Sequence, residues 1–130
     1  LIAAQSCLVP FDCDDFSRQA LYTLFNTVKE IKEDHNEELA VEGIVANQFQ
    51  PRAKLPRQLL DELIEEGLPL LQALLSASAK MRESHQQAKP LIHMAASHKL
   101  TAQFVELHQE INGNKKAARK KATRSTSGTA

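Results

Sequence analysis

Short apolar runs alternate with segments of helical periodicity along the first 111 residues, and this alternation constrains the fold more than any other feature. The apolar runs are strand-like and occupy residues 7–11, 39–49 and 68–75. The other segments repeat their apolar residues every three or four positions, as amphipathic helices do. These amphipathic segments occupy residues 16–33, 56–66 and 98–111, and a further short helix is expected after the turn at residues 76–78, to about Gln87. Strands that alternate with helices predict a parallel sheet with right-handed crossovers, and hence an α/β fold.

Two short segments are less clear. Residues 68–75 are rich in leucine and fit a strand or a helix by periodicity, but the flanking Gly67 and Pro69 and the short length favour a strand. Residues 89–93 form a further short extended piece, a possible fourth strand. Asn112 and Gly113 are expected to end the last helix.

The predicted sheet is too small to be complete. Three or four parallel strands expose at least one long parallel edge, and such edges are normally buried. We therefore expect a partial three-layer fold that belongs to a longer polypeptide, which also fits a first residue, Leu1, that is not Met.

Charge divides the chain into two parts. None of the 16 acidic residues lies after residue 110, whereas six of the 16 Lys and Arg residues do. The sequence therefore predicts an acidic domain over residues 1–111 and a basic tail over residues 112–130 that is disordered when alone.

Several function classes are excluded by their missing signatures. No apolar run is long enough to span a membrane, no signal peptide is visible, and neither a zinc-hydrolase nor a nucleophile motif occurs. The spacing of Cys7 and Cys13 matches no zinc or redox motif, so we expect free thiols in a reducing cytoplasm, with a disulfide as the minor alternative.

Polar residues follow the predicted strands. Asn47 ends an apolar run, and its side chain offers both a donor and an acceptor, although it could also cap a turn. Asp12, Asp14 and Asp15 follow the first strand. They could bind Mg²⁺, but capping of the next helix explains at least one of them, and we favour capping over a metal site.

Five segments together resemble the second half of the ParA/MinD-type P-loop ATPases. They are Leu1-Ile2-Ala3-Ala4; Leu8-Val9-Pro10-Phe11 with the helix after it; Gly43-Ile44-Val45-Ala46-Asn47; Ser78-Ala79-Lys80-Met81-Arg82-Glu83-Ser84 with Lys89-Pro90-Leu91; and Ser97-His98-Lys99 with the last helix. The resemblance covers residues 1 to about 111 and rests on the order and spacing of these segments. Its departures are the absent phosphate-binding loop with its lysines, Gln5 where Asp is frequent, and Ser76 where Pro is common.

The resemblance implies a nucleotide-base site. It assigns Asn47 to the edge of adenine, and it places Ser76, Ala77 and Ser78 on the other side of the base, mainly through backbone groups. No catalytic residue and no metal ligand is expected among the 130 residues. ATP and Mg²⁺ are expected as cofactors of the longer protein, and none is expected for this chain alone.

The resemblance also implies binding to DNA without sequence preference. Candidate contacts in the domain are Arg52, Arg57 and Arg82, and those in the tail are Lys115, Lys116, Arg119 and Lys120. Solvated surface charge is the alternative for the former, and a solubilising tail for the latter. Such contacts would be strongly dependent on salt.

Two hypotheses for function follow. The first is a part of a bacterial, cytoplasmic and nucleoid-associated partition ATPase of the ParA type, which binds ATP as a homodimer, binds DNA and is stimulated by a ParB-like partner. That whole protein is expected to be a Mg²⁺-dependent enzyme, whereas this chain alone is expected to be inactive. The second is a non-enzymatic small α/β module that binds DNA through its basic tail.

Overall fold

The fold is a three-layer α/β arrangement built on a small parallel sheet. In the computed structural model, the backbone is described for residues 1–126 and the side chains for residues 1–114. The strands are β1 (Ser6–Asp12), β2 (Ala40–Phe49) and β3 (Leu70–Ser76), in the order β1-β2-β3. The helices are α1 (Asp15–Asp34), α2 (Lys54–Glu65), α3 (Ala79–Gln86), α4 (Leu91–Met94) and α5 (Lys99–Thr126). The predicted α/β class is confirmed.

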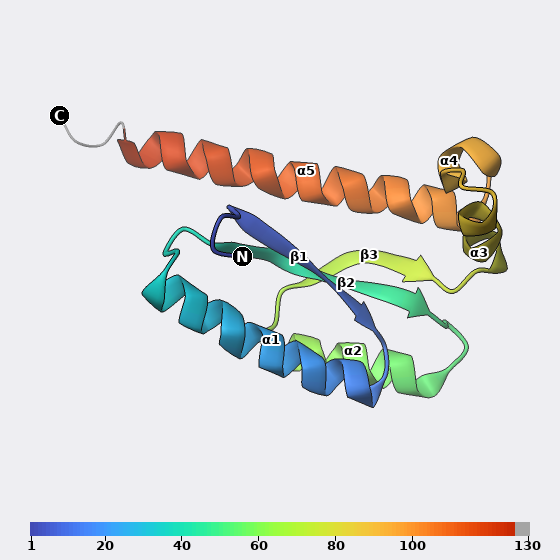
Figure 1. Cartoon of the computed structure of the whole chain (residues 1–130), viewed down its shortest axis with the longest axis horizontal. Helices are drawn as coiled ribbons and strands as arrows, with labels where there is room; N and C mark the ends of the chain where they lie inside the picture. The colour runs from blue at the N-terminus through green and yellow to red at the C-terminus, as the bar shows by residue number, and fades with distance from the viewer. Residues whose placement is uncertain (127–130) are drawn as a thin grey trace.

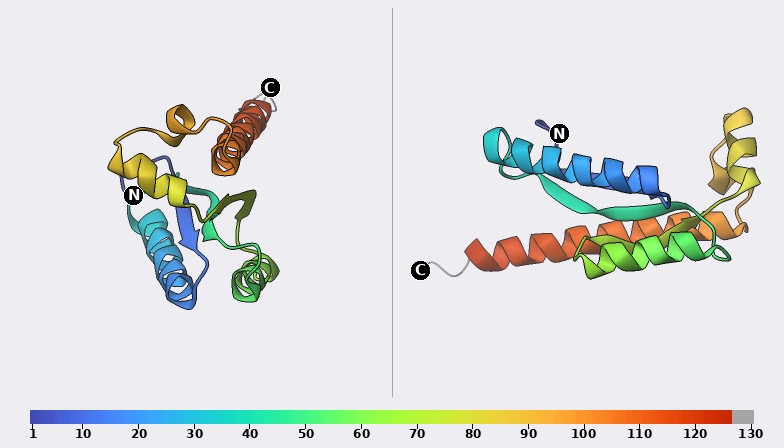
Figure 2. Two further views of the ribbon diagram at one scale, coloured as in Figure 1. Left: turned by 90° about the vertical axis from the view of Figure 1, so that its right-hand side faces the viewer. Right: turned by 90° about the horizontal axis from the view of Figure 1, so that it is seen from below.

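Helices cover both faces of the sheet. Helices α1 and α2 lie on one face and α5 crosses the other, while α3 and α4 lie near the carboxyl ends of the strands (Figures 1 and 2). Alternate residues of β2 point to opposite layers: Ile44 and Ala46 join the core under α1 and α2, and Val45 joins the core under α5. This double coverage explains why β2 is an almost continuous apolar run.

The core under α5 is centred on β3 and leaves β1 uncovered on that face. Its buried members from the sheet are Val45, Leu71, Ala73 and Leu75, with none from β1. Strand β1 packs Val9 and Phe11 against α1, so its alternate residues Leu8 and Pro10 face the α5 side, and both are exposed. The exposed parallel edge that the sequence predicts is therefore at β1.

Side chains of α5 close the outer edge of β3. The backbone N–H groups of Gln72 and Ala73 donate to the two carboxylate oxygens of Glu110, at 2.9 and 3.0 Å. The backbone N–H of Ser76 donates to Oε1 of Gln103 at 2.9 Å, and Nε2 of Gln103 donates to the Ser76 hydroxyl at 2.9 Å. These bonds satisfy donors that an edge strand would otherwise present to another strand.

The extended piece expected at residues 89–93 is helical instead. Leu91–Met94 forms α4, and Leu91 is buried in the core with α5. A fourth strand beside β3 would need the N–H groups that Glu110 and Gln103 already occupy. The prediction of a possible strand at this position is wrong for that reason.

Helix α5 runs through Asn112 and Gly113, where the sequence predicts its end. Gly in a helix interior costs roughly 1 kcal/mol relative to Ala, and the residues that follow, such as Lys115 to Lys121, are mostly strong helix formers. The helical backbone to Thr126 shows that this boundary is wrong. The division of function between residues 1–111 and 112–130 stays a prediction, and residues 127–130 of that tail lie outside the described residues.

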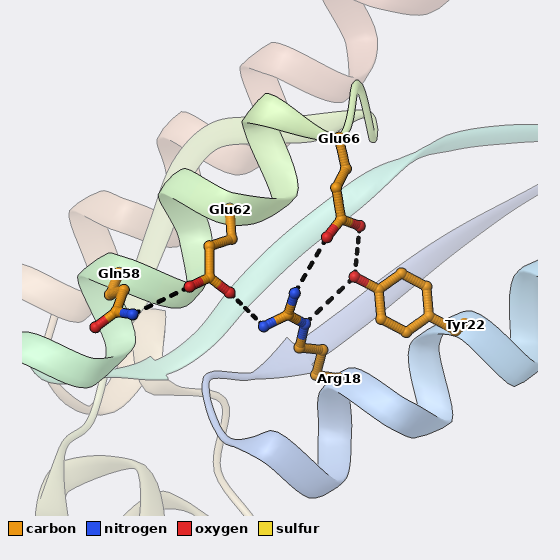
Figure 3. A network of polar contacts seen from close by, with 5 residues as sticks. All are labelled: Arg18, Tyr22, Gln58, Glu62 and Glu66. Atoms are coloured by element: carbon orange, nitrogen blue, oxygen red, sulfur yellow. Dashed lines mark hydrogen bonds and ion pairs between the residues drawn. The ribbon is translucent and has the colours of Figure 1, made fainter.

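A polar network ties α1 to α2 on the outer surface (Figure 3). Arg18 on α1 forms ion pairs with Glu62 and Glu66, the second at 3.1 Å, and Tyr22 donates a hydrogen bond to Glu66. The Tyr22 hydroxyl and Glu62 both raise the pKa of Arg18. Both helices are thereby held side by side beneath the sheet.

Candidate functional site

The carboxyl ends of the three strands gather the residues that the sequence singled out. In the register of the sheet Asp12 of β1 is paired with Asn47 of β2, and Phe49 of β2 is paired with Ser76 of β3. In open parallel sheets ligands bind beyond these strand ends. The polar residues predicted from the sequence therefore lie along the side of the sheet where the carboxyl ends of its strands meet.

Asn47 is half-buried and is held by Asp12. Its Nδ2 donates to Oδ1 of Asp12 at 2.9 Å, and Nε2 of the neighbouring Gln48 donates to Oδ2 of the same carboxylate at 3.3 Å. Gln48 has a φ of +50° at a point where the pairing of β2 with β3 shifts register. Strand β2 continues two residues beyond Asn47, to Phe49, so Asn47 is not its last residue.

A groove of about 820 Å³ lies at the ends of β2 and β3. Ser76, Ala77 and Ser78 line one side of it, and Arg52, Lys80 and Lys99 also line it. Asn47 is not among its lining residues, so the structure groups the serine turn with basic side chains and places Asn47 nearer to β1.

The serine turn is ordered by hydrogen bonds. The hydroxyl and N–H of Ser76 are both engaged by Gln103, and the N–H of Ala77 donates to the carbonyl of Phe49 at 3.1 Å. Ser78 caps α3, because its hydroxyl accepts from the N–H of Lys80 at 3.1 Å. These bonds occupy the hydroxyl groups of Ser76 and Ser78 and the backbone N–H groups of Ser76 and Ala77.

The acidic residues after β1 divide into different roles. Asp14 caps α1, since its carboxylate accepts from the N–H of Ser17 at 2.7 Å, which confirms capping for one of the three. Asp12 holds Asn47 and Gln48, a role that sequence reasoning missed because the pairing of β1 with β2 cannot be read from local pattern. Over the side chains that the structure describes, no group of three His, Cys, Asp or Glu residues is arranged to hold a metal ion.

The basic candidates of the domain do not form one surface. Arg52 lines the groove beside the serine turn and also a second groove along α2, which it shares with Lys54 and Arg57. That second groove mixes these cations with Asp61, Glu62 and Glu65. Arg82 is exposed on α3 and lines neither groove. The tail candidates Lys115, Lys116, Arg119 and Lys120 lie on the helical backbone of α5, but their side chains are outside the described part.

A mostly apolar cavity was not predicted from the sequence. It has a volume of about 830 Å³ and lies between α3, α4 and α5, where Met81, Leu91, Ile92, Phe104 and Val105 provide most of its apolar lining. The helical repeat of residues 98–111 indicated a buried face but not that this face continues into an open cavity. Among the described residues no helix is long and apolar enough to cross a membrane.

Several known proteins are similar to this chain in sequence. No protein-family model matches the chain. The chromosome partitioning protein ParA of Myxococcus xanthus is 25% identical over 114 residues, which cover 85% of this chain and 40% of that protein. The sporulation initiation inhibitor protein Soj of Bacillus subtilis is 22% identical over 115 residues, which cover 88% of this chain and 46% of that protein. The chain is thus similar in sequence to ParA/Soj partition proteins over most of its own length.

The similarity to ParA and Soj covers most of the chain but not most of either relative. The chain spans less than half the length of the curated relatives it matches, and it is consistent with their C-terminal part. Among solved structures, a cobyrinic acid a,c-diamide synthase from Mycobacterium smegmatis with a bound ATP analogue and magnesium has a TM-score of 0.54 and 20% sequence identity. The match covers 60% of this chain and 32% of that one, and it supports the P-loop NTPase-like fold.

Proposed function

We propose that the chain is the base-recognition part of a ParA-type partition ATPase. The observation that carries this proposal is the placement of Asn47 on β2 and Ser76 on the adjacent β3, both near the carboxyl ends of these strands. Strands about 4.8 Å apart, with a rise of about 3.3 Å per residue, put the Cα atoms of Asn47 and Ser76 roughly 8 Å apart. One flat purine ring can bridge that separation, with the basic groove beside it open to the phosphates.

The ATP and Mg²⁺ of the proposed whole protein would be held mainly by parts that these residues do not supply. No glycine-rich phosphate loop occurs in the chain. Arg52, Lys80 and Lys99 line the groove beside the serine turn, and they would favour an anionic ligand there. Lys80 is also paired with Glu83 at 2.7 Å, which lowers the net charge that it offers.

The proposed base site is tested by titrating the chain with adenosine at millimolar concentrations and recording its amide NMR spectrum. The side-chain amide of Asn47 and the backbone amides of Ser76, Ala77 and Ser78 should shift together. Asn47→Ala should weaken binding, whereas Asn26→Ala, a change on the exposed side of α1, should not. Shifts scattered over the surface, or none at all, would show that this edge binds no purine.

DNA binding without sequence preference is the second part of the proposal, along with a homodimer and a ParB-like partner for the whole protein. It is supported by the helical backbone of α5, which carries the basic tail out past the sheet (Figure 1). A helix rich in Lys and Arg can neutralise several phosphates at once, which makes binding steeply dependent on salt.

The DNA proposal is tested by fluorescence anisotropy with duplexes of unrelated sequence over a series of salt concentrations. Changing Lys115, Lys116, Arg119 and Lys120 together to Gln should flatten the salt dependence, because each lost phosphate contact removes roughly one unit from the slope. Arg52→Gln with Arg57→Gln is the matched pair of changes in the domain. An unchanged slope in both variants would contradict DNA binding by these residues.

A further inference from the structure

The hydrogen bonds of Asp12 bear on how Asn47 is oriented. Asp12 lies beside Asn47 across the ladder between β1 and β2, and its two carboxylate oxygens accept from two amides, those of Asn47 at 2.9 Å and Gln48 at 3.3 Å. The bulged backbone at Gln48, with its positive φ, is the local feature that lets two successive side chains approach the same carboxylate.

A carboxylate can only accept hydrogen bonds when it is ionised. Asn47 must therefore turn its nitrogen toward Asp12, and its carbonyl oxygen lies on the other edge of the planar amide group. One N–H of Asn47 is used by Asp12, which leaves the second N–H and the carbonyl oxygen for a ligand. The opposite orientation would set the Asn47 oxygen against the carboxylate and is disfavoured by repulsion.

Other roles for Asp12 do not fit its contacts. The cap of α1 is Asp14, whose carboxylate accepts from Ser17. Asp12 contributes a backbone carbonyl to that turn, accepting from the N–H of Asp14 at 2.6 Å, but its side chain turns to β2. The side chain is therefore committed to the two amides.

We propose that Asp12 is a positioning residue that fixes the orientation of Asn47 and so makes the site prefer a 6-aminopurine to a 6-oxopurine. This inference rests on the proposed base site. The exocyclic amine of adenine donates to the Asn47 oxygen, whereas the 6-oxo group of hypoxanthine would meet that oxygen acceptor to acceptor. Asp12 thus acts through Asn47 and does not itself contact the base.

The experiment compares adenosine with inosine, which differ at the 6-position, by NMR titration of the full chain and of Asp12→Asn. Asparagine at position 12 can donate as well as accept, so Asn47 is released to take either orientation. The preference of the chain for adenosine should fall by about tenfold in this variant, since a mispaired polar group loses on the order of one hydrogen bond. Asp15→Asn removes one negative charge three residues away, at the first residue of α1; Asp15 is not the residue that holds Asn47, so this variant should keep the preference.

The side-chain amide signals of Asn47 give a readout that does not depend on binding. In the unchanged chain one of the two amide protons should be shifted by its bond to Asp12, and that shift should disappear in Asp12→Asn. If adenosine binds and the preference survives in Asp12→Asn, the positioning role is overturned while the base site stands. If neither nucleoside perturbs Asn47, the base site fails and takes the proposed preference with it. An unchanged Asn47 amide signal in Asp12→Asn overturns the positioning itself.

Discussion

At the scale of single residues, close packing explains why one residue type is needed at a given position. Gly43 lies in the centre of β2, and a Cβ added there would come within 2.6 Å of Cγ and Cδ2 of Leu71 on β3. Leu71 is buried among the residues under α5, so it cannot move aside freely. The packing of the Leu71 side chain against the backbone of β2 therefore favours glycine at position 43.

Gly43→Ala should lower the free energy of unfolding by about 1–3 kcal/mol, because it overpacks a filled core. Gly113→Ala is the matched control, since Gly113 lies inside α5 with no atom near its added Cβ. This control should raise stability by about 0.5–1 kcal/mol. Urea unfolding of both variants checks the prediction, and equal effects of the two changes would contradict it.

The thiol of Cys13 is a second case at this scale. Burial, followed by the charges of Asp12 and Asp14, raises its pKa from 9.0 to about 11. The Cys13 thiol therefore ionises at lower pH in the unfolded chain than in the folded chain. Its contribution to the free energy of unfolding is fully present below pH 9 and is lost as the pH rises toward 11.

In a Cys7→Ser background, alkylation of Cys13 by iodoacetamide should be slow at pH 8, where about one thiol in a thousand is ionised. The rate should rise through about pH 11 and should increase at pH 8 in denaturant. Mass spectrometry of timed samples measures it. A rate in the folded chain equal to that of the unfolded chain at pH 8 would contradict the raised pKa.

At the scale of elements, α5 decides where the sheet stops. Its residues Gln103 and Glu110, two turns apart, reach the N–H groups of β3 from outside the sheet. Helix α5 therefore supplies hydrogen-bond acceptors to the N–H groups of β3, as a fourth strand would at this edge. It also explains why residues 91–94 fold as α4 and do not extend the sheet.

Glu110→Ala should destabilise the chain by about 1–3 kcal/mol, because two strand N–H groups lose their acceptor. Hydrogen exchange at Gln72 and Ala73 should become faster in the same variant. Glu106→Ala, on the exposed side of the same helix, is the control and should change neither quantity by much. Unchanged exchange at Gln72 and Ala73 in Glu110→Ala would show that α5 does not protect this edge.

At the scale of the whole molecule, the sheet is closed at β3 and open at β1. Leu8 and Pro10 remain exposed on the face of β1 that α5 does not reach. In the matched ParA and Soj proteins the matched region accounts for less than half of the length.

The chain alone should not hydrolyse Mg-ATP, because phosphoryl transfer depends on positioning and charge neutralisation by a phosphate loop and its metal. Phosphate release from ATP, measured at several chain concentrations, should not exceed the blank. Asn47→Ala serves as the matched control. Release that scales with the chain and is lost in Asn47→Ala would contradict this prediction and assign hydrolysis to the chain itself.

The sequence by itself determined the class and order of the elements. The pattern of its apolar residues predicted β1, α1, β2, α2 and β3 in sequence, and the positions of Asn47 and Ser76 near strand ends followed from that order. These features depend on local pattern, which a single sequence carries. Helix α5 extends beyond Gly113, where the sequence predicts its end, because the helix formers that follow offset the cost of this glycine.

Only the tertiary structure decided the contacts between distant segments. The pairing of Asp12 with Asn47 depends on the register of β1 with β2, and the closing of β3 depends on where α5 crosses the sheet. The grouping of the serine turn with Arg52 and Lys99 depends on two loops and a helix start that meet in space. Such contacts arise from register and packing, for which neighbouring residues in the chain carry no signal.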